Sequence, residues 1–558
     1  MPKLKALEQL AVWKGRYPAP CQAACPVHTD VRSYVTLTAQ RRFDEAYLAA
    51  RGPNPLPAVC GRACSAPCED VCTRREFDRP LPIRRLKRFL SDRYHVPPSL
   101  MPTVHATSCA VGVVGAGPTG LAAAHDLALL GHSVTVYEAA PEPGGMAVLG
   151  VPRFRLALQA IRRDVQDIEA LGVTIRNGLR VGRDVSLESL RQANDVVLVA
   201  AGAMRPNQLD VPAVGLPGVV QALGFLEEAN LGGRPACGKQ VAVIGGGYTA
   251  IDAARTALRL GAEVTVLYRR TRSESEVHDE ELEETLHEGI RIEYLVSPVR
   301  VVDDGHGRVG GVEFIRNALG EPDPSGRPRP VPIPCSEFVH TCDMVILALG
   351  QSPDAQALDP ELANVLRDVD RATLMTPISG VFAAGDFVTG PSTIIEAIAD
   401  GRAAASAIHR YLAETRSALK PWPEVPETWP LAPVAIPPPG TAMHRENDQG
   451  RSKLSLVAEV EDPPEVAWAV GDSLRCLYCG LVPRVIFDRC TACQECALVC
   501  PTNCIARVAL NPDNSTRAIQ NPNDVIVYEI SGEECIRCGR CFGACPTGAI
   551  VVEGFSWD

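Results

Sequence analysis

The chain has 558 residues, too many for one hydrophobic core, and its length predicts roughly three or four domains. Its 55 lysines and arginines against 66 aspartates and glutamates give a net charge of −11, which argues against nucleic acid as a partner. No apolar stretch reaches the roughly 20 residues of a membrane span, and the N-terminus lacks a secretory signal pattern, so we expect a cytoplasmic protein without a membrane span.

Twenty-one cysteines are the strongest signal in the sequence. Disulfides are rare in the cytoplasm, so cysteines that cluster there indicate metal sites. Six of them lie between Cys21 and Cys72, and eleven lie between Cys476 and Cys545. The four between these groups are isolated, and we interpret them as ordinary buried thiols.

The middle of the chain alternates strand-like and helical runs, as a parallel α/β sheet does, and it contains an internal repeat. Residues 111–138 (VGVVGAGPTGLAAAHDLALLGHSVTVYE) align without a gap with residues 241–268 (VAVIGGGYTAIDAARTALRLGAEVTVLY). Each copy predicts a strand, a glycine turn, a helix and a second strand. Two such units predict two nucleotide-binding domains.

The first copy is a dinucleotide fingerprint that ends on an acid, Glu138. Its three glycines are Gly115, Gly117 and Gly120. They let backbone N–H groups approach a pyrophosphate at a helix N-terminus, while the acid accepts hydrogen bonds from ribose hydroxyls. An acid at this place favours an adenosine with a free 2′-hydroxyl, as in FAD.

The second copy has Gly245 and Gly247, but Tyr268 stands where the first copy has its acid, followed by Arg269 and Arg270. Loss of the acid and gain of two guanidiniums suit the 2′-phosphate of NADP(H). The alternative is that both arginines lie on a solvated strand end, which leaves NAD(H) open.

Two later strands, in DVVLVAAGA and DMVILALGQSPD, end in small residues, and GVFAAGDFVTGPSTIIEAIADGRAAA places Asp386 after a strand and before a helix. In two-domain flavoproteins this aspartate binds the flavin side of FAD, and the helix N-terminus faces the isoalloxazine. Further residues expected to line the two cofactor sites are Pro118, Gly145, Met146, Arg155, Gly202, Tyr248, Thr249, Gly350, Gly385 and Thr393. No redox C-x-x-C follows the first fingerprint, so we do not expect a flavin–disulfide relay.

The C-terminal cysteines twice fit C-x₂-C-x₂-C-x₃-C-P, the spacing of bacterial two-cluster ferredoxins, in which each fourth cysteine serves the other cluster. Zinc is the alternative, but it generally uses two separated C-x-x-C pairs. We assign one [4Fe–4S] cluster to Cys490, Cys493, Cys496 and Cys545, and the other to Cys535, Cys538, Cys541 and Cys500.

Residues 1–415 resemble the small subunit of bacterial glutamate synthase, the large subunit of NADH-dependent ferredoxin:NADP oxidoreductase and the N-terminal half of dihydropyrimidine dehydrogenase. The matching pieces are NPLPAVCGRAC…PCEDVC, VVGAGPTGLAAA, VIGGGYTAIDAARTALRLGA…YRR and GVFAAGDF. The resemblance implies that FAD lies between an NADPH domain and a helical N-terminal domain that carries two [4Fe–4S] clusters.

The chain departs from that pattern because no RCxxC pair precedes Cys21, whereas an RCLYCG occurs at residues 475–480. We hypothesise that Cys476 and Cys479 fold back and complete a cluster with Cys21 and Cys72. The second N-terminal cluster would use Cys25, Cys64 and Cys68, with Cys60 as the fourth ligand, because Lys87 stands where dihydropyrimidine dehydrogenase has a glutamine and cannot ligate while protonated. Alternatively, Cys476 and Cys479 join Cys504 in a separate site or remain plain thiols.

The predicted fold class is therefore α/β, with two Rossmann-like domains between a helical iron–sulfur domain and a bacterial-ferredoxin-like α+β domain. The predicted boundaries are an iron–sulfur domain at 1–105, an FAD domain at 106–230 and 346–415, an NAD(P)H domain at 231–345, a proline-rich linker at 416–470 and a ferredoxin-like domain at 471–558.

Hydride transfer between nicotinamide and flavin needs alignment and no side-chain acid or base, so we predict cofactor ligands but no catalytic residue. The predicted function is an NAD(P)H:ferredoxin-type electron-transfer flavoprotein. Its partners would be soluble ferredoxin or the other subunits of a redox complex, such as a 2-oxoacid:ferredoxin or aldehyde oxidoreductase. The alternatives are the glutamate synthase small subunit itself and a scaffold that keeps its cofactors without activity of its own.

Overall fold

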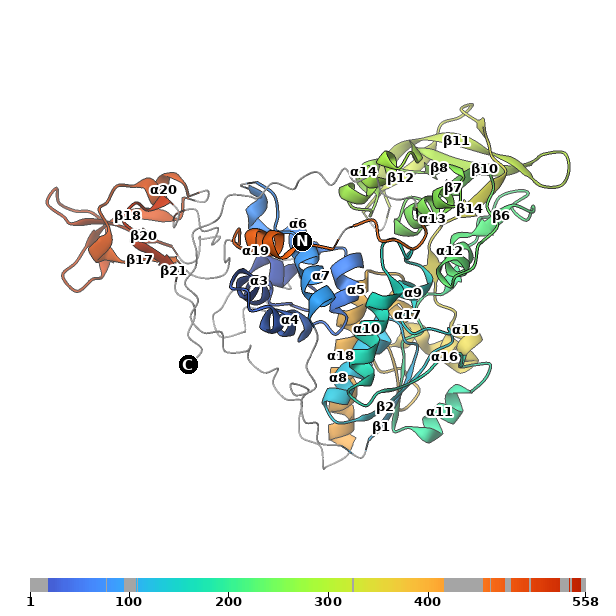
Figure 1. Ribbon diagram of the computed structural model, residues 1–558, viewed down its shortest axis with the longest axis horizontal. Coiled ribbons are helices and arrows are strands. Elements are labelled where there is room, and N and C mark those ends of the chain that lie inside the picture. The colour runs from blue at the N-terminus through green and yellow to red at the C-terminus, as the bar shows by residue number, and fades with distance from the viewer. Residues whose placement is uncertain are drawn as a thin grey trace.

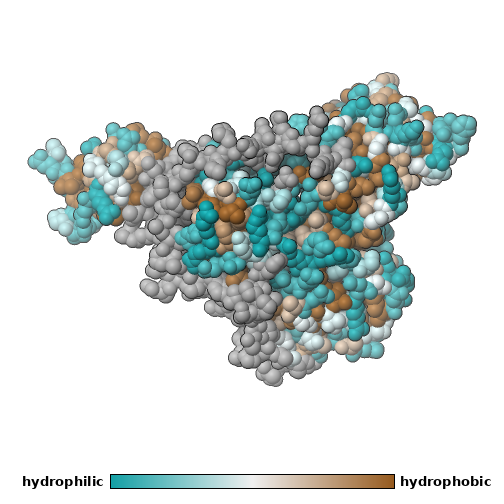
Figure 2. All heavy atoms as spheres, viewed as in Figure 1, coloured by the Kyte–Doolittle hydropathy of each residue, from teal (hydrophilic) through white to brown (hydrophobic). Residues whose placement is uncertain are grey.

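The computed structural model describes residues 19–76, 78–94, 107, 109–323, 326–415, 455–461, 463–476, 483–500, 503–531, 541 and 544–552. These residues form an N-terminal helical domain, two α/β domains and a small C-terminal module (Figure 1). None of the helices in these ranges is long and apolar enough to cross a membrane. Hydrophilic and hydrophobic residues are interspersed on the face that Figure 2 shows.

The N-terminal domain is built from short helices, three of which begin with a proline. Proline suits this position because its fixed φ is helical and its missing N–H is not needed in the first turn. The helices are α2 (Pro20–Ala24), α3 (Val31–Ala39), α4 (Phe43–Arg51), α5 (Pro57–Ala63), α6 (Pro67–Asp70), the 3₁₀ turn η1 (Thr73–Glu76) and α7 (Ile83–Arg93). Tyr34 and Phe89 lie fully buried at their centre.

The first α/β domain is a parallel five-stranded sheet of order β16-β4-β1-β2-β3. Its strands are β1 (Ala110–Val114), β2 (Ser133–Tyr137), β3 (Thr174–Arg176), β4 (Val196–Val199) and β16 (Val381–Ala383). Its helices are α8 (Pro118–Leu129), α9 (Met146–Leu149), α10 (Leu158–Glu169), α11 (Leu187–Ala193), α17 (Asp386–Thr389) and α18 (Ile394–Thr415).

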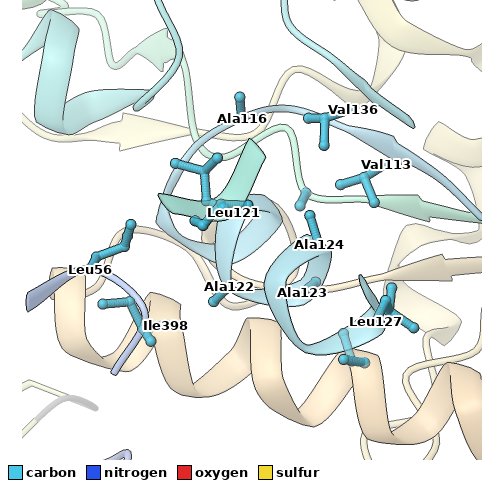
Figure 3. Packing of buried hydrophobic residues seen from close by; sticks show 14 of the residues in the cluster. Leu56, Val113, Ala116, Leu121, Ala122, Ala123, Ala124, Leu127, Val136 and Ile398 are labelled. Carbon is cyan, nitrogen blue, oxygen red and sulfur yellow. The ribbon is translucent and has the colours of Figure 1, made fainter. Parts of the chain in front are cut away.

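Helix α18 packs closely on α8 because both present small residues at their contact (Figure 3). A Cβ on Gly401 would lie 2.2 Å from the carbonyl oxygen of Thr119, so no larger residue fits there. Figure 3 also shows Leu56, from the N-terminal domain, beside Ile398 of α18. The first α/β domain and part of the N-terminal domain therefore share one hydrophobic core.

A buried carboxylate strengthens this junction. Asp164 of α10 is fully buried, and its two carboxylate oxygens accept the backbone N–H groups of Ala58 (3.2 Å) and Val59 (2.9 Å) at the start of α5. These are donors that a helix cannot pair internally. Burial raises the pKa of Asp164 to about 7, opposed by these hydrogen bonds.

The second α/β domain is a parallel sheet of order β6-β14-β7-β8-β9. Its elements are β6 (Val219–Gln221), α12 (Ala222–Asn230), β7 (Gln240–Ile244), α13 (Tyr248–Arg259), β8 (Glu263–Tyr268), η3 (Arg272–Glu274), α14 (Asp279–His287), β9 (Arg291–Tyr294) and β14 (Met344–Leu347). The structure thus places β6 and α12 in this domain, whereas the sequence assigned residues up to 230 to the first one. Strand β6 is short and precedes the glycine fingerprint, so no local sequence pattern indicates that it belongs to the second sheet.

An antiparallel sheet that the sequence did not predict is inserted between β9 and β14. Its strands are β10 (Val296–Asp303), β11 (Val309–Pro322), β12 (Pro328–Pro332) and β13 (Phe338–Thr341). The two crossings between the α/β domains, β5 (Arg205–Pro206) and β15 (Gln351–Ser352), pair with each other. After β15 the chain forms α15 (Ala355–Leu358), α16 (Pro360–Val365) and η4 (Leu366–Asp368).

Residues 455–461 and 463–476, which we call the return segment, lie against three domains. The N–H of Val460 donates to the carbonyl of Phe154 in the first α/β domain (2.9 Å), and the guanidinium of Arg259 in the second donates to the carbonyl of Ser455 (3.1 Å). Helix α19 (Val466–Ser473) packs on α3 and α7. Part of the predicted linker range is therefore packed structure.

Ion pairs hold the return segment to the N-terminal domain. Glu459 accepts hydrogen bonds from Arg62 and from Arg88 (2.7 Å to Arg88), and Glu461 accepts from Arg84 (3.1 Å). Arg88 is only 2% exposed. At the far end Arg475, fully buried, donates to Asp78 (2.9 Å) and to Asp472. Arg84 and Arg88 of α7 thus bind carboxylates that are more than 370 residues away in the sequence.

The C-terminal module contains two antiparallel sheets, β17-β21 and β19-β18-β20. Its elements are β17 (Pro483–Val485), η5 (Phe487–Arg489), α20 (Glu495–Leu498), β18 (Ile505–Leu510), β19 (Thr516–Arg517), β20 (Ile526–Ile530) and β21 (Ile550–Val552). Pairing of β17 with β21 brings the two ends of the module together, which also brings Cys545 close to Cys490, Cys493 and Cys496.

Glu459→Ala is expected to loosen the return segment. Removing one partner of a buried ion pair costs about 3 kcal/mol, which corresponds to a roughly hundredfold increase in local opening. Hydrogen exchange of the Val460 amide, which is bound to Phe154, should accelerate accordingly. The exposed pair of Arg42 and Glu45 supplies the control, because Glu45→Ala should leave this amide unchanged. Unaltered exchange in Glu459→Ala would contradict the assigned role.

Candidate functional site

The turn between β1 and α8 forms a cradle of bare backbone. Gly115 has φ +102°, and a Cβ there would lie 2.5 Å from the carbonyl oxygen of Ala200. A Cβ on Gly120 would lie 1.9 Å from the carbonyl oxygen of Gly115. Gly117 is the N-cap of α8, and Pro118 is its first residue. Only glycine fits at positions 115 and 120. The turn points the N-terminus of α8 toward the site where a pyrophosphate would bind.

Glu138 lies directly beneath that turn. Its carboxylate accepts the N–H groups of Ala116 (2.6 Å) and Ala140 (2.7 Å) and is 7% exposed. Burial raises the pKa of Glu138, and the backbone hydrogen bonds oppose the rise. A carboxylate fixed at this point fits the ribose of an adenosine.

A second loop lies across the fingerprint. Gly145 has φ +54°, a Cβ on it would lie 2.7 Å from the Cα of Gly117, and Met146 follows as the first residue of α9. On the other side, a Cβ on Gly385 would lie 2.3 Å from the hydroxyl oxygen of Thr119 in α8. The three predicted segments around residues 115, 145 and 385 therefore converge on one end of α8.

Asp386 and the start of α18 complete this end of the cradle. The Asp386 carboxylate accepts the hydroxyl (2.6 Å) and the N–H (3.1 Å) of Ser392, and burial raises its pKa. Thr393 and Glu396 exchange hydrogen bonds as a capping box before Ile394, which fixes the helix N-terminus. Gly202 and Gly350, at φ +69° and +87°, follow β4 and β14 and precede the crossing strands β5 and β15. No neighbour lies within 4 Å of a Cβ on Gly202.

The second fingerprint is built in the same way but with different chemistry. A Cβ on Gly245 would lie 2.3 Å from the carbonyl oxygen of Ala348, and Gly247 is the N-cap of α13, which starts with Tyr248 and Thr249. The Tyr268 ring packs where Glu138 lies in the first domain, because a Cβ on Gly246 would lie 2.2 Å from it. The ribose carboxylate is thus replaced by a packed ring.

The two predicted phosphate-binding arginines have different environments. Arg270 is 4% exposed, donates to the carbonyl of Pro328 (2.9 Å) and pairs with Asp323 (2.7 Å) of the inserted sheet. Arg269 is exposed. The sequence interpretation treated them as equal candidates, but a partner that is remote in sequence already occupies Arg270.

Arg155, which the sequence placed at the cofactor site, lies between the two α/β domains. Its guanidinium binds both carboxylate oxygens of Asp252 (2.7 and 2.8 Å) and also Glu281, and it stacks 5.5 Å from the centre of the Tyr248 ring. Burial opposes its charge, but these carboxylates raise the pKa of Arg155. It therefore joins the two nucleotide domains at the start of α13.

The N-terminal cysteines separate into two neighbourhoods. Cys25, Cys60 and Cys64 lie in or against the core that is shared with the first α/β domain. Cys21 and Cys72 lie against the core of the helical domain, in which Cys68 and Cys476 are buried. The return segment thus brings Cys476 into the same core cluster as Cys21 and Cys72, although most of the chain separates them in sequence.

Lys87 is buried near the first of these neighbourhoods and also near Cys68, which interacts with Cys64 and Cys25 across the boundary between the two. Burial lowers the pKa of its ammonium, but the charges of Cys25, Cys60, Cys64 and Cys68 raise it, and on balance the pKa lies above its usual value. The ammonium therefore stays charged next to four sulfurs. A fixed positive charge beside an iron–sulfur cluster favours the reduced state of the cluster.

The C-terminal cysteines line a small hollow in the module. Cys490, Cys493, Cys496 and Cys545 surround it, together with Tyr528. Burial raises the pKa of Cys496, and the charges of Cys490, Cys545 and Cys493 add to the rise. The sulfur of Cys500 lies 3.4 Å from that of Cys504, and Cys541 is buried in the same core. Cys479, Cys535 and Cys538 lie outside the described residues.

In the described part of the chain, no three His, Cys, Asp or Glu side chains are close enough to hold a single metal ion. A cubane cluster holds its four thiolates farther apart than a single ion does, and grouped cysteines without other ligands suit iron–sulfur chemistry. The donor sets therefore fit [4Fe–4S] clusters, and the two glycine cradles fit dinucleotides.

Sequence reasoning missed three side chains that join these parts: Asp164, Glu459 and His278. The imidazole Nε2 of His278, at the start of α14, donates to the backbone carbonyl of Ser65, in the loop between Cys64 at the end of α5 and Cys68 in α6. None of the three belongs to a motif, and each is recognised only by a partner that is distant in sequence.

Comparison with known proteins agrees with this geometry. Residues 109–401 match the pyridine nucleotide-disulphide oxidoreductase family, residues 16–96 match dihydropyrimidine dehydrogenase domain II with its 4Fe-4S cluster, and residues 487–549 match a 4Fe-4S dicluster domain. These matches confirm the predicted fold class and the predicted cofactors: FAD, a nicotinamide dinucleotide and [4Fe–4S] clusters.

Three relatives indicate the setting. The chain is 40% identical over 438 residues to the NADPH-Fe(3+) oxidoreductase subunit beta of Geobacter sulfurreducens (72% of this chain, 65% of the relative). It is 39% identical over 425 residues to the NADP(+)-dependent formate dehydrogenase subunit beta of Moorella thermoacetica (71% and 60%). It is 36% identical over 415 residues to the glutamate synthase [NADPH] small chain of Azospirillum brasilense (70% and 86%). The match thus spans less than two thirds of the length of the first two relatives.

Cys476→Ser tests whether the return segment supplies a cluster ligand. If Cys476 binds iron together with Cys21 and Cys72, the purified variant should lose one cluster's worth of iron and sulfide per chain while it keeps its FAD. Cys342→Ser, at a buried thiol of the second α/β domain, is the control and should keep all of its iron. Full iron content in Cys476→Ser would exclude it as a required ligand.

Proposed function

Because the chain belongs to the pyridine nucleotide-disulphide oxidoreductase family and carries 4Fe-4S domains on both sides of the family's core, we propose that it is the nicotinamide-reactive subunit of a larger redox complex. It is an NAD(P)H oxidoreductase. The proposal adds the route within the chain, from nucleotide to FAD, to the N-terminal clusters and then to the C-terminal clusters, in either direction. We also propose that it works in the cytoplasm, where cluster-ligating thiols stay reduced.

The observation that carries this route is the placement of Cys476. It is buried in one core with Cys68, and Cys21 and Cys72 pack against that core. The segment that holds it there leads directly into the C-terminal module. A cluster held by Cys21, Cys72, Cys476 and Cys479 would therefore join the two iron–sulfur regions through shared ligands. We assign the second N-terminal cluster to Cys25, Cys60, Cys64 and Cys68.

The residues of the chain would act by binding and by orientation. FAD, when bound, accepts a hydride as an electron pair and releases the electrons singly to the clusters. Glu138 would hold the adenosine ribose, and Asp386 with the N-terminus of α18 would hold the flavin half. The N-terminus of α13 would hold the pyrophosphate of the nicotinamide nucleotide. The Arg155–Asp252 pair joins the two domains that must align the two rings.

The partner is proposed to be a low-potential enzyme such as a 2-oxoacid:ferredoxin or aldehyde oxidoreductase. Two of the relatives are by name beta subunits of oxidoreductases, one of them of a formate dehydrogenase. The C-terminal dicluster module would give this chain a second site of electron exchange besides the nucleotide site, which favours a docked or ferredoxin-like acceptor. The glutamate synthase small chain is a second candidate, because the match covers 86% of that relative.

Reduction of a viologen by NADPH and by NADH tests the enzymatic part. The purified chain should reduce the dye with at least one nucleotide, and FAD-depleted protein should not. Absence of activity with either nucleotide, in protein that contains FAD and iron, would contradict the proposal. Proteins that co-purify with the chain then separate the candidates: a glutamate synthase large subunit favours the second, and any other oxidoreductase favours the first.

The two arginines predict a change in nucleotide preference. Arg269→Ala should raise KM for NADPH roughly tenfold, because a charged hydrogen bond to the 2′-phosphate is lost, and should leave the kinetics with NADH unchanged. Arg270→Ala removes the buried partner of Asp323 and should mainly lower thermal stability. Arg308→Ala, at another exposed arginine of this domain, is the control. An equal effect of Arg269→Ala on both nucleotides would refute its role at the phosphate.

A further inference from the structure

One residue of the nucleotide domain contacts the loop between α5 and α6, which lies between Cys64 and Cys68. The imidazole Nε2 of His278 hydrogen-bonds the backbone carbonyl of Ser65. Since a carbonyl oxygen can only accept, the ring nitrogen must be the donor. Ser65 directly follows Cys64 and lies three residues before Cys68 in the sequence. The contact therefore reaches between two of the proposed ligands of one cluster.

The loop that receives this hydrogen bond has little freedom. The N–H of Ala66 donates to the sulfur of Cys64 (3.3 Å). Ala66 has φ +48°, in the left-handed region that alanine rarely adopts, and Pro67 then fixes the start of α6. A loop constrained in this way passes a displacement at Ser65 on to the neighbouring cysteines instead of absorbing it.

The same histidine is bound to the nucleotide site. Its backbone N–H donates to the phenol oxygen of Tyr248 (3.2 Å), and the two rings lie 6.4 Å apart. Tyr248 is the first residue of α13, directly after the N-cap Gly247 at the pyrophosphate cradle. A nucleotide bound at this helix N-terminus contacts the backbone on which Tyr248 is carried. A continuous chain of contacts therefore runs from Gly247 through Tyr248 and His278 to Ser65.

We propose that His278 is a positioning residue that couples occupancy of the nucleotide site to the reduction potential of the cluster held by Cys25, Cys60, Cys64 and Cys68. This inference rests on the proposed function, because it needs that cluster. Hydrogen-bond donors and positive partial charge near a cluster stabilise its reduced, more negative state. The imidazole N–H donates to the Ser65 carbonyl, whose peptide group also contains the Ala66 N–H that donates to the Cys64 sulfur. A nucleotide that fixes Tyr248 therefore fixes His278, which polarises this peptide and strengthens the hydrogen bond to the sulfur, and this should raise the potential.

Thermodynamic linkage makes the effect reciprocal. If the nucleotide raises the potential, reduction of the cluster must tighten nucleotide binding by the same factor. We expect a factor of about five, near the low end of typical couplings between sites. For a one-electron couple this factor corresponds to about 40 mV, at 59 mV per tenfold change. A contact that only holds two domains together would produce neither effect.

The test is an EPR-monitored redox titration of the full chain, with and without 1,4,5,6-tetrahydro-NADP, a nucleotide that cannot accept electrons from the clusters. In the wild type the nucleotide should raise the reduction potential of the cluster held by Cys25, Cys60, Cys64 and Cys68 by about 40 mV. In His278→Ala the shift should disappear while iron and FAD content stay unchanged. His278→Gln, which keeps an N–H donor, should retain part of the shift. His287→Ala, at an exposed histidine at the other end of α14, is the matched control.

Tyr248→Phe gives a second approach that leaves His278 in place. It removes the phenol oxygen that binds the His278 amide and should also abolish the shift. The inference would be overturned if the nucleotide did not shift the potential of the wild type, or if the shift in His278→Ala were as large as in the wild type. The proposed function would still stand in either case, provided that the protein reduces viologen normally. Loss of the cluster signal from wild-type protein would instead refute the proposed function, and this inference with it.

Discussion

The arrangement of the cofactor regions depends on a few ion pairs between the return segment and helices α5 and α7. Glu459 and Glu461 bind the guanidiniums of Arg62, Arg84 and Arg88, whose charges would be costly to bury without carboxylate partners. The same segment is hydrogen-bonded to both α/β domains at Phe154 and Arg259. Charge neutralisation on α5 and α7 thus places a distant part of the chain, with Cys476, against the N-terminal domain.

A second set of contacts fixes the nucleotide domain against its neighbours. Arg155 reaches from the first α/β domain to Asp252 and Glu281 in the second, and His278 reaches from the second to Ser65 in the helical domain. All of these contacts gather around the start of α13. The place where the nucleotide is expected to bind is therefore also the place where three domains meet, so that binding there can influence its neighbours without a separate relay.

Structural features that depend on short, local sequence patterns could be predicted from the sequence. The glycines around residues 115 and 245, the acid at Glu138 and the ferredoxin spacing near Cys490 follow from local geometry, and the family matches confirm the fold class and cofactors that they implied. The grouping of Cys476 with Cys21 could be stated only as a hypothesis, since it rested on a missing pair elsewhere.

Features that depend on remote partners were not predictable. No sequence pattern near Arg270 indicates its partner Asp323, because Asp323 belongs to an inserted antiparallel sheet that interrupts the βαβ pattern. The place of β6 in the second sheet depends on β14, more than a hundred residues later. The roles of Asp164 and His278 are likewise set by backbone groups of another domain, which no local pattern specifies.

We propose that electrons cross from the nucleotide domains to the C-terminal module through a cluster that the return segment completes. Anaerobic stopped-flow mixing with NADPH, followed at the flavin and iron–sulfur absorption bands, tests it most directly. We expect the flavin of Cys476→Ser to bleach at the wild-type rate while its C-terminal clusters stay oxidised. Reduction of those clusters at the wild-type rate in Cys476→Ser would contradict it.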